Sequence, residues 1–265
     1  MISSSPVSRQ ILLEVCVASV EDAQTAAAGG ADRIELNAAL ELAGLTPSAG
    51  VLREVRRAVS LPIVVMVRPR PGGFCYSAAE FRVMRRDVDS ALEDGADGVA
   101  FGILTETGEI DHERCRQLVE QVGDRPGGRF QGAVFHRAFD FTPNPVAALE
   151  ALIDVSCARV LTSGGRETAS EGATRIGELI ARAAGRIEVL PAGGIRAHNV
   201  ADLISRTGCN QVHASVTEKR RDRSLAAGPN LSACGPEFGQ YSVASVKLLK
   251  ELVDALSSLP GQIPP

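Results

Sequence analysis

Short runs of apolar and β-branched residues recur eight times along the chain, and each run ends in a polar or glycine-rich tip before a helix-forming stretch. Strand-like runs that alternate with helical stretches are typical of parallel βαβ units. Eight such units in 265 residues predict an α/β fold, a closed (β/α)8 barrel of the TIM type. The predicted strands cover residues 11–16, 33–36, 63–67, 98–101, 133–135, 159–161, 187–190 and 211–213.

Capping sequences mark several helix starts. Ser19, Ser77 and Thr168 each stand three residues before an acidic residue, which is the spacing of a capping box. The segment 217–241 contains glycines and prolines but has little periodicity, so we expect it to be a loop that covers the mouth of the barrel. The basic stretch 219–223 is expected to be a solvated part of this loop. A final helix over residues 242–256 would close the outer ring.

Composition favours one globular domain without nucleic-acid or membrane partners. No linker interrupts the interior, so a single domain over residues 1–265 is expected, with flexible ends at about 1–9 and 258–265. The net charge of −4 gives no basic nucleic-acid surface. No apolar run approaches the ~18 residues of a membrane span, and the first nine residues lack a signal-like apolar region. Six scattered cysteines without CxxC pairs indicate reduced, cytoplasmic thiols.

Two glutamates stand inside apolar strands and are candidates for chemistry. Active sites of TIM barrels lie at the C-terminal strand ends, and alternate strand residues share a face, so Glu14 shares a face with Cys16. Neighbouring strands would bring Glu14 and Glu35 together, although a buried carboxylate is costly unless it is paired. Two interpretations stay open: an acid–base or cation-binding pair, or structural ion pairs with Arg68 or Arg137.

His136 ends the fifth predicted strand, four residues before Asp140. An imidazole at a strand tip suits general acid–base catalysis or metal binding, and Asp140 could orient the ring. The alternative is a structural hydrogen-bond donor. His213, at the end of the eighth predicted strand, has a weaker case of the same kind. If the chain is an enzyme, the candidate catalytic residues are Glu14, Glu35, His136 and Asp140.

Strand-end arginines and glycine turns form a candidate anion site. Arg68 ends the third strand and suits a bidentate grip on a carboxylate or phosphate; its alternative role is to neutralise a strand glutamate. Small-residue turns after strands six and seven allow backbone N–H groups to approach an anion, where TIM barrels commonly bind phosphate. The candidate anion-binding residues are Arg68, Arg137, Ser163, Gly164, Gly193 and Gly194.

Two cysteines offer a candidate metal site. The chain has no HxH or CxxC spacing, but Cys16 lies at a strand tip and Cys75 lies in the third loop, from which it can approach Cys16. A pair of cysteines suits a soft ion such as Cu(I). The alternative is that both thiols are inert packing groups.

Several of these segments resemble the CutC family of copper homeostasis proteins. The matching segments, in the family's order, are LEVC (13–16), GADRIEL (30–36), GLTPS (44–48), RPR (68–70), FCYS (74–77), FHRAFD (135–140) and LTSG (161–164). The resemblance implies a TIM-type barrel, a cytoplasmic location and a homo-oligomer. It also implies that copper binds two interior cysteines on the first two strands; Cys16 matches the first, and Asn37 stands at the second.

Two functions follow from these features. The first is a copper homeostasis protein that binds Cu(I) through Cys16, with Cys75 or His136 completing the site. The second is a TIM-barrel enzyme that acts on a small anionic or phosphorylated metabolite by Glu and His acid–base chemistry, an analogy at the level of the fold. The expected partner is therefore a metal ion or a small molecule.

Overall fold

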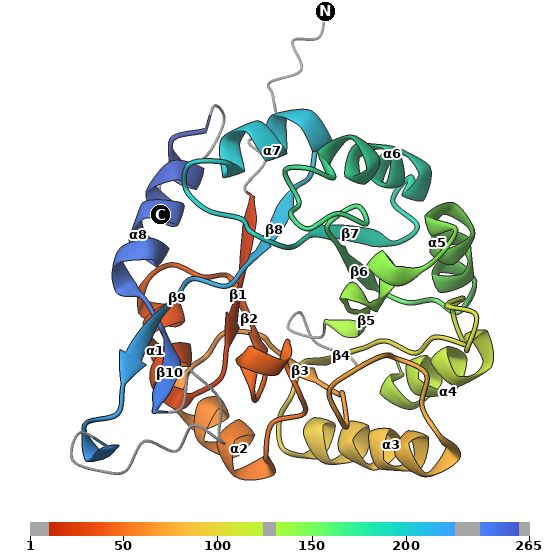
Figure 1. Ribbon diagram of the computed structural model, residues 1–265, viewed down its shortest axis with the longest axis horizontal. Coiled ribbons are helices and arrows are strands. Elements are labelled where there is room, and N and C mark those ends of the chain that lie inside the picture. Colours follow the sequence, from red (N-terminus) through yellow and green to blue (C-terminus); the bar gives the residue numbers. More distant parts are fainter. Residues whose placement is uncertain (1–10, 124–130, 226–238, 260–265) are drawn as a thin grey trace, which may run out of the picture.

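The computed structural model describes residues 11–123, 131–225 and 239–259, which form a ring of strands surrounded by helices (Figure 1). The predicted flexible ends, apart from residues 258 and 259, lie outside the described residues.

Eight parallel strands form one sheet in the order β7-β6-β5-β4-β3-β2-β1-β8. An isolated parallel bridge between Ala192 and His213 joins the two edges, so the predicted barrel is confirmed. Each strand ends within a residue or two of its predicted limits. The strands are β1 (Leu12–Val17), β2 (Arg33–Leu36), β3 (Ile63–Met66), β4 (Gly98–Phe101), β5 (Gly132–Phe135), β6 (Arg159–Thr162), β7 (Glu188–Pro191) and β8 (Gln211–Ala214).

Helices follow the strands and form the outer ring (Figure 1). The α-helices are α1 (Val20–Ala28), α2 (Ala49–Ala58), α3 (Ala78–Glu93), α4 (His112–Val122), α5 (Pro145–Asp154), α6 (Ala173–Ala183), α7 (Val200–Thr207) and α8 (Val246–Ser257). Short 3-10 helices are η1 (Leu40–Leu42), η2 (Arg137–Phe141) and η3 (Arg223–Leu225). Among the described helices, none combines the length and the apolar character needed to cross a membrane.

Two of the three predicted capping residues cap a helix in the structure. Ser19 caps α1, and Ser77 forms a complete capping box with Glu80 at the start of α3. Thr168 also accepts a hydrogen bond from the N–H three residues later, but it does so in a turn before the helix. The N-cap of α6 is Gly172, so the helix start predicted at Thr168 is wrong.

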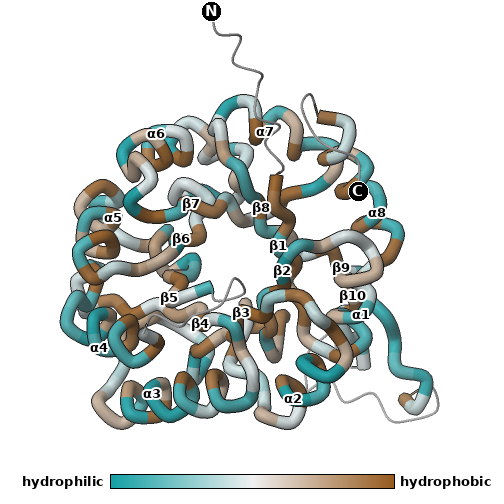
Figure 2. The backbone as a smooth tube through the Cα atoms, turned by 180° about the vertical axis from the view of Figure 1, so that it is seen from behind, coloured by the Kyte–Doolittle hydropathy of each residue, from teal (hydrophilic) through white to brown (hydrophobic). Residues whose placement is uncertain are grey.

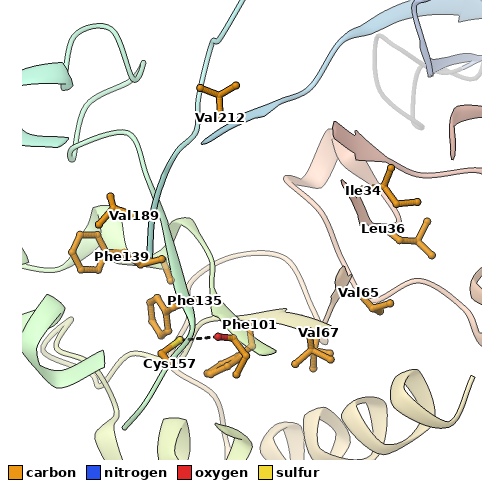
Figure 3. Packing of buried hydrophobic residues seen from close by; sticks show 14 of the residues in the cluster. Ile34, Leu36, Val65, Val67, Phe101, Phe135, Phe139, Cys157, Val189 and Val212 are labelled. Carbon is orange, nitrogen blue, oxygen red and sulfur yellow. Dashed lines mark hydrogen bonds between the residues drawn. The ribbon is translucent and has the colours of Figure 1, made fainter. Parts of the chain in front are cut away.

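Alternate strand residues point outward and pack between the strands and the helices. Phe101, Phe135 and Phe139 gather in this layer, where the rings of Phe101 and Phe135 meet edge to face with centroids 5.8 Å apart (Figure 3). Inside the barrel, strands β3 to β7 and the residue after β7 contribute a small apolar cluster of Val64, Met66, Ala100, Val134, Leu161, Leu190 and Ala192. Hydrophobic residues occur both along strands of the ring and on the helices around it (Figure 2).

The segment after β8 differs from the predicted loop. Strands β9 (Thr217–Arg221) and β10 (Gln240–Ala244) form an antiparallel hairpin beside α1, outside the ring and away from the barrel mouth (Figure 1). The Ala244 N–H donates to Asp22 of α1 at 2.7 Å. Residues 242–244 therefore belong to a strand, and the helix predicted from 242 begins at Val246. The charged, exposed sequence of β9 lacks the alternation that would have predicted a strand; residues 226–238 lie outside the described residues.

Candidate functional site

Three neighbouring strands carry the polar half of the barrel interior. Glu14 on β1 lies opposite Arg33 on β2 and opposite His213 on β8, whereas Cys16 on β1 lies opposite Glu35. All of these except His213 are less than a tenth exposed, and the His213 side chain is 12% exposed. Because neighbours in a parallel sheet share a face when they are in register, all five side chains meet inside the barrel.

Glu14 is fully paired by charges on both sides. Its carboxylate accepts a hydrogen bond from Arg33 Nε, and its Oε1 lies 2.7 Å from His213 Nδ1. Burial alone would raise the pKa of Glu14, but the Arg33 charge and the His213 hydrogen bond outweigh it and hold the pKa well below its ordinary value. The predicted ion pairs with Arg68 or Arg137 are wrong. The partner is Arg33, which stands two residues before Glu35 on the same strand face.

Cys16, Glu35 and His213 form a cluster of potential metal ligands, which we call the ligand cluster. One donor atom from each residue lies within 4.8 Å of the other two. Asn37 Nδ2 donates to Glu35 Oε2 at 2.9 Å and contacts Cys16 Sγ at 3.3 Å. Glu35 Oε1 is buried and, among the described residues, has no hydrogen-bond partner. Because Glu14 engages His213 Nδ1, the ring's Nε2 is left as the nitrogen for a metal.

Burial and neighbouring charges shift the pKa values of the ligand cluster. Burial raises the pKa of the Cys16 thiol and that of Glu35. Burial would lower the pKa of His213, but the Glu35 charge, a hydrogen bond with Cys16 and the contact with Glu14 raise it well above its ordinary value. A thiol and an imidazolium must lose their protons before they can act as ligands, so metal binding here would release protons.

The charged state of His213 predicts a specific dependence of stability on pH. A histidine whose pKa is higher in the folded state than in the unfolded state stabilises the fold when it is charged. This stabilisation is fully present below the unfolded-state pKa of about 6.5 and is lost as pH rises through the folded-state pKa. As pH rises from about 6.5 toward the folded value, we expect wild type to lose up to about 1.4 kcal/mol of unfolding free energy per pH unit relative to His213→Gln. Urea unfolding at several pH values measures this difference. Parallel pH profiles of the two proteins would rule out the charged His213.

The residues predicted to form an anion turn are occupied by Asp140. Its carboxylate accepts hydrogen bonds from the Ser163 N–H at 3.0 Å, from the Gly165 N–H at 3.1 Å and from Arg137 Nε at 2.8 Å. The Gly164 N–H, in turn, donates to the Thr162 hydroxyl at 2.8 Å. The N–H groups of Ser163 and Gly164 are therefore already hydrogen-bonded within the protein and are not available to an external anion. Asp140 stabilises this turn.

The expected pairing of Asp140 with His136 is also wrong. His136 Nδ1 accepts a hydrogen bond from the Ala138 N–H at 3.1 Å, which orients the ring. Burial and the nearby Arg68 charge lower the pKa of His136 to about 3, so the imidazole is neutral at physiological pH. His136 can thus donate one hydrogen bond but cannot serve as a cationic acid.

A cavity of about 870 Å³, which we call the mouth cavity, connects most of the predicted site residues. The predicted residues on its wall are Cys16, Glu35, Arg68, Cys75, His136, Arg137, Gly193 and Gly194. Gly193 has a φ of 109°, and a Cβ atom there would lie 3.2 Å from Arg137 Nη1, so the glycine makes room for that side chain. Glu14, Asp140, Ser163 and Gly164 lie behind the wall. Cys75 is exposed and lies outside the ligand cluster.

Comparison with known proteins identifies relatives over nearly the whole chain. The model of the CutC family matches residues 11–218. A CutC family protein of Treponema denticola is 41% identical over 251 residues, which covers 95% of this chain and all of that protein. A human copper homeostasis protein cutC homolog is 43% identical and covers 91% of this chain and 88% of its own length. The crystal structure of CutC from Streptococcus agalactiae superposes with a TM-score of 0.71 at 32% identity, over 77% of this chain and 98% of the other.

Proposed function

The chain belongs to the CutC family, and on this premise we propose that it is a copper homeostasis protein that binds a copper ion, as cargo, at Cys16, Glu35 and His213. The observation that carries the proposal is that three donor atoms lie within 4.8 Å of one another, and that one of the three residues, Glu35, has a buried carboxylate oxygen without a partner among the described residues. An unpaired carboxylate oxygen is costly to bury, and a cation beside it removes that cost.

Two of the three proposed donors, the Cys16 thiolate and the His213 imidazole, suit copper. Thiolate sulfur suits Cu(I), and imidazole suits copper in general. The Glu14 carboxylate beside His213 Nδ1 resembles the carboxylate–histidine–metal arrangement in which an outer carboxylate orients the ring. Asn37 donates to two of the ligands and is itself not counted among them. The proposal therefore keeps Cys16, as the sequence predicted, and replaces Cys75 and His136 with Glu35 and His213.

The rest of the proposed function follows from the same chemistry. A reduced Cys16 requires a reducing compartment, so we place the protein in the cytoplasm. The described cysteines are free thiols, which is compatible with that location. We further propose one domain that assembles into a homo-oligomer and takes a metal ion or small molecule, without a nucleic-acid or membrane partner.

Anaerobic titration with Cu(I) against a competing chelator tests the copper site. Cys16→Ala should weaken Cu(I) binding by about 100-fold or more, because losing a direct ligand should exceed the ~10–100-fold effect of an outer partner. Glu35→Gln removes the charge of a second proposed ligand but keeps an oxygen donor, so it should weaken binding by at least about tenfold and by less than Cys16→Ala does. Cys75→Ala is the matched control, since it removes an exposed thiol of the same cavity, and it should bind like wild type.

A parallel titration with Zn²⁺ addresses the nature of the metal, because thiolate and imidazole also suit zinc. Tighter binding of Cu(I) than of Zn²⁺ supports the copper proposal. Unchanged Cu(I) affinity in Cys16→Ala, or preferential binding of Zn²⁺, would contradict it.

A further inference from the structure

Two buried nitrogen donors, on residues that line the mouth cavity, have no hydrogen-bond partner among the described residues. They are Arg68 Nε and His136 Nε2, and both residues are at least nine-tenths buried. The two side chains lie against the same ring. The Arg68 guanidinium carbon is 5.1 Å from the centre of the Phe74 ring, and the His136 ring centre is also 5.1 Å from it.

The Arg68 guanidinium is hydrogen-bonded but not neutralised. Its Nη1 donates to the Leu42 and Gly44 carbonyl oxygens at 2.9 and 3.0 Å, and its Nη2 donates to the Gly72 carbonyl oxygen at 2.9 Å. No described carboxylate forms an ion pair with it within 4.0 Å. Carbonyl oxygens and the Phe74 face reduce the cost of burying a cation, but a buried charge usually also has an anion beside it.

His136 complements this cation with a neutral donor. Because Nδ1 accepts from the Ala138 N–H, the single ring proton of neutral His136 is on Nε2. The low pKa of His136 keeps the ring in this state at physiological pH. Nε2–H is therefore a fixed donor, and Asp140, the predicted partner of the ring, is engaged with the turn after β6.

We propose that Arg68 and His136 form an oxyanion subsite in the mouth cavity, which binds the carboxylate or phosphate group of a small organic molecule. Arg68 supplies the charge and the Nε–H, and His136 supplies the Nε2–H. Apolar side chains in the same wall, among them Met66, Phe74 and Leu161, suit the organic part of such a ligand. The subsite uses none of the copper ligands, so it goes beyond the proposed function.

Calorimetric titration of the metal-depleted full chain with succinate, and separately with inorganic phosphate, tests the subsite. At least one probe should bind with a Kd of about 1 mM or tighter. Arg68→Lys keeps the charge and can still donate to the surrounding carbonyls, but it lacks Nε–H. His136→Asn keeps an acceptor for the Ala138 N–H, but it lacks Nε2–H. Each variant should weaken binding at least about tenfold, which corresponds to about 1.4 kcal/mol.

Arg70→Lys is the matched control, because Arg70 is a half-exposed arginine of the same loop that already pairs with Glu80. It should bind the probes like wild type. Preferential binding of succinate assigns a carboxylate ligand, and preferential binding of phosphate assigns a phosphate ester. Absence of binding by both probes, or equal binding by all four proteins, would overturn the subsite. Cu(I) affinity, measured on the same variants, should be unchanged, which separates a failure here from a failure of the copper site.

Discussion

Replacing Glu14 with glutamine is expected to lower the free energy of unfolding by about 3–5 kcal/mol, the largest single effect that we predict for an isosteric change. The glutamine side chain keeps the shape of the glutamate but removes the negative charge. Arg33 and His213 would then be buried as two neighbouring cations without the carboxylate that now lies between them. Urea unfolding at neutral pH, followed by circular dichroism, measures the loss.

Glu35→Gln is the control for this prediction, because it makes the same change on the next strand. Burial raises the pKa of Glu35, and one of its oxygens has no partner among the described residues, so its charge is already disfavoured. Neutralising Glu35 should therefore cost clearly less than neutralising Glu14, although the Glu35 charge also raises the pKa of His213. The depressed pKa of Glu14 gives a second check. The contribution of the Glu14 charge to stability is present above the unfolded-state pKa of about 4.3, and it is lost as pH falls through the folded-state pKa. In acid, the difference in unfolding free energy between wild type and Glu14→Gln should therefore disappear. Equal losses in both variants would contradict the assignment.

Substituting Gly172 with alanine should destabilise the protein by about 3 kcal/mol or more, because the added methyl group would collide with backbone atoms that cannot rotate away. A Cβ atom on Gly172 would lie 1.8 Å from the Ser163 carbonyl oxygen and 3.0 Å from Gly164 Cα. The turn that carries Ser163 would have to move away from the start of α6. Its hydrogen bonds to Asp140 would be disturbed as well.

Gly50→Ala is the corresponding control, since Gly50 lies in α2 and the nearest atom to its added methyl group would be 3.8 Å away. A glycine-to-alanine change without strain should stabilise the protein by about 0.4–1 kcal/mol through the unfolded state. Thermal and urea unfolding of both variants give the comparison. A stable Gly172→Ala protein would show that the two segments are less tightly packed than their backbone distance indicates.

Local patterns in the sequence determine the barrel and the inner face of its first two strands. Alternation with period two places Glu14 and Cys16 on one face of β1, and the eightfold recurrence of strand and helix signals leads to the (β/α)8 fold. The family resemblance also rests on short contiguous segments. These features depend on neighbours in the chain, so they can be read without the structure. The hairpin β9–β10 could not, because β9 is charged and mostly exposed, whereas β10 is held by contacts with α1.

Which charges meet inside the barrel is decided only by the tertiary structure. Glu14 lies 19 residues from Arg33 and 199 from His213, and their contact depends on strand register and on closure of the barrel through β8. The same is true of Asp140. It accepts a hydrogen bond from Ser163, which is 23 residues away in the sequence, and not from His136, which is only four residues away. Residue type and strand position identify a polar side chain as a candidate site residue. Its partner depends on the geometry of neighbouring strands, because a buried charge is stable only beside a compensating group that is close in space.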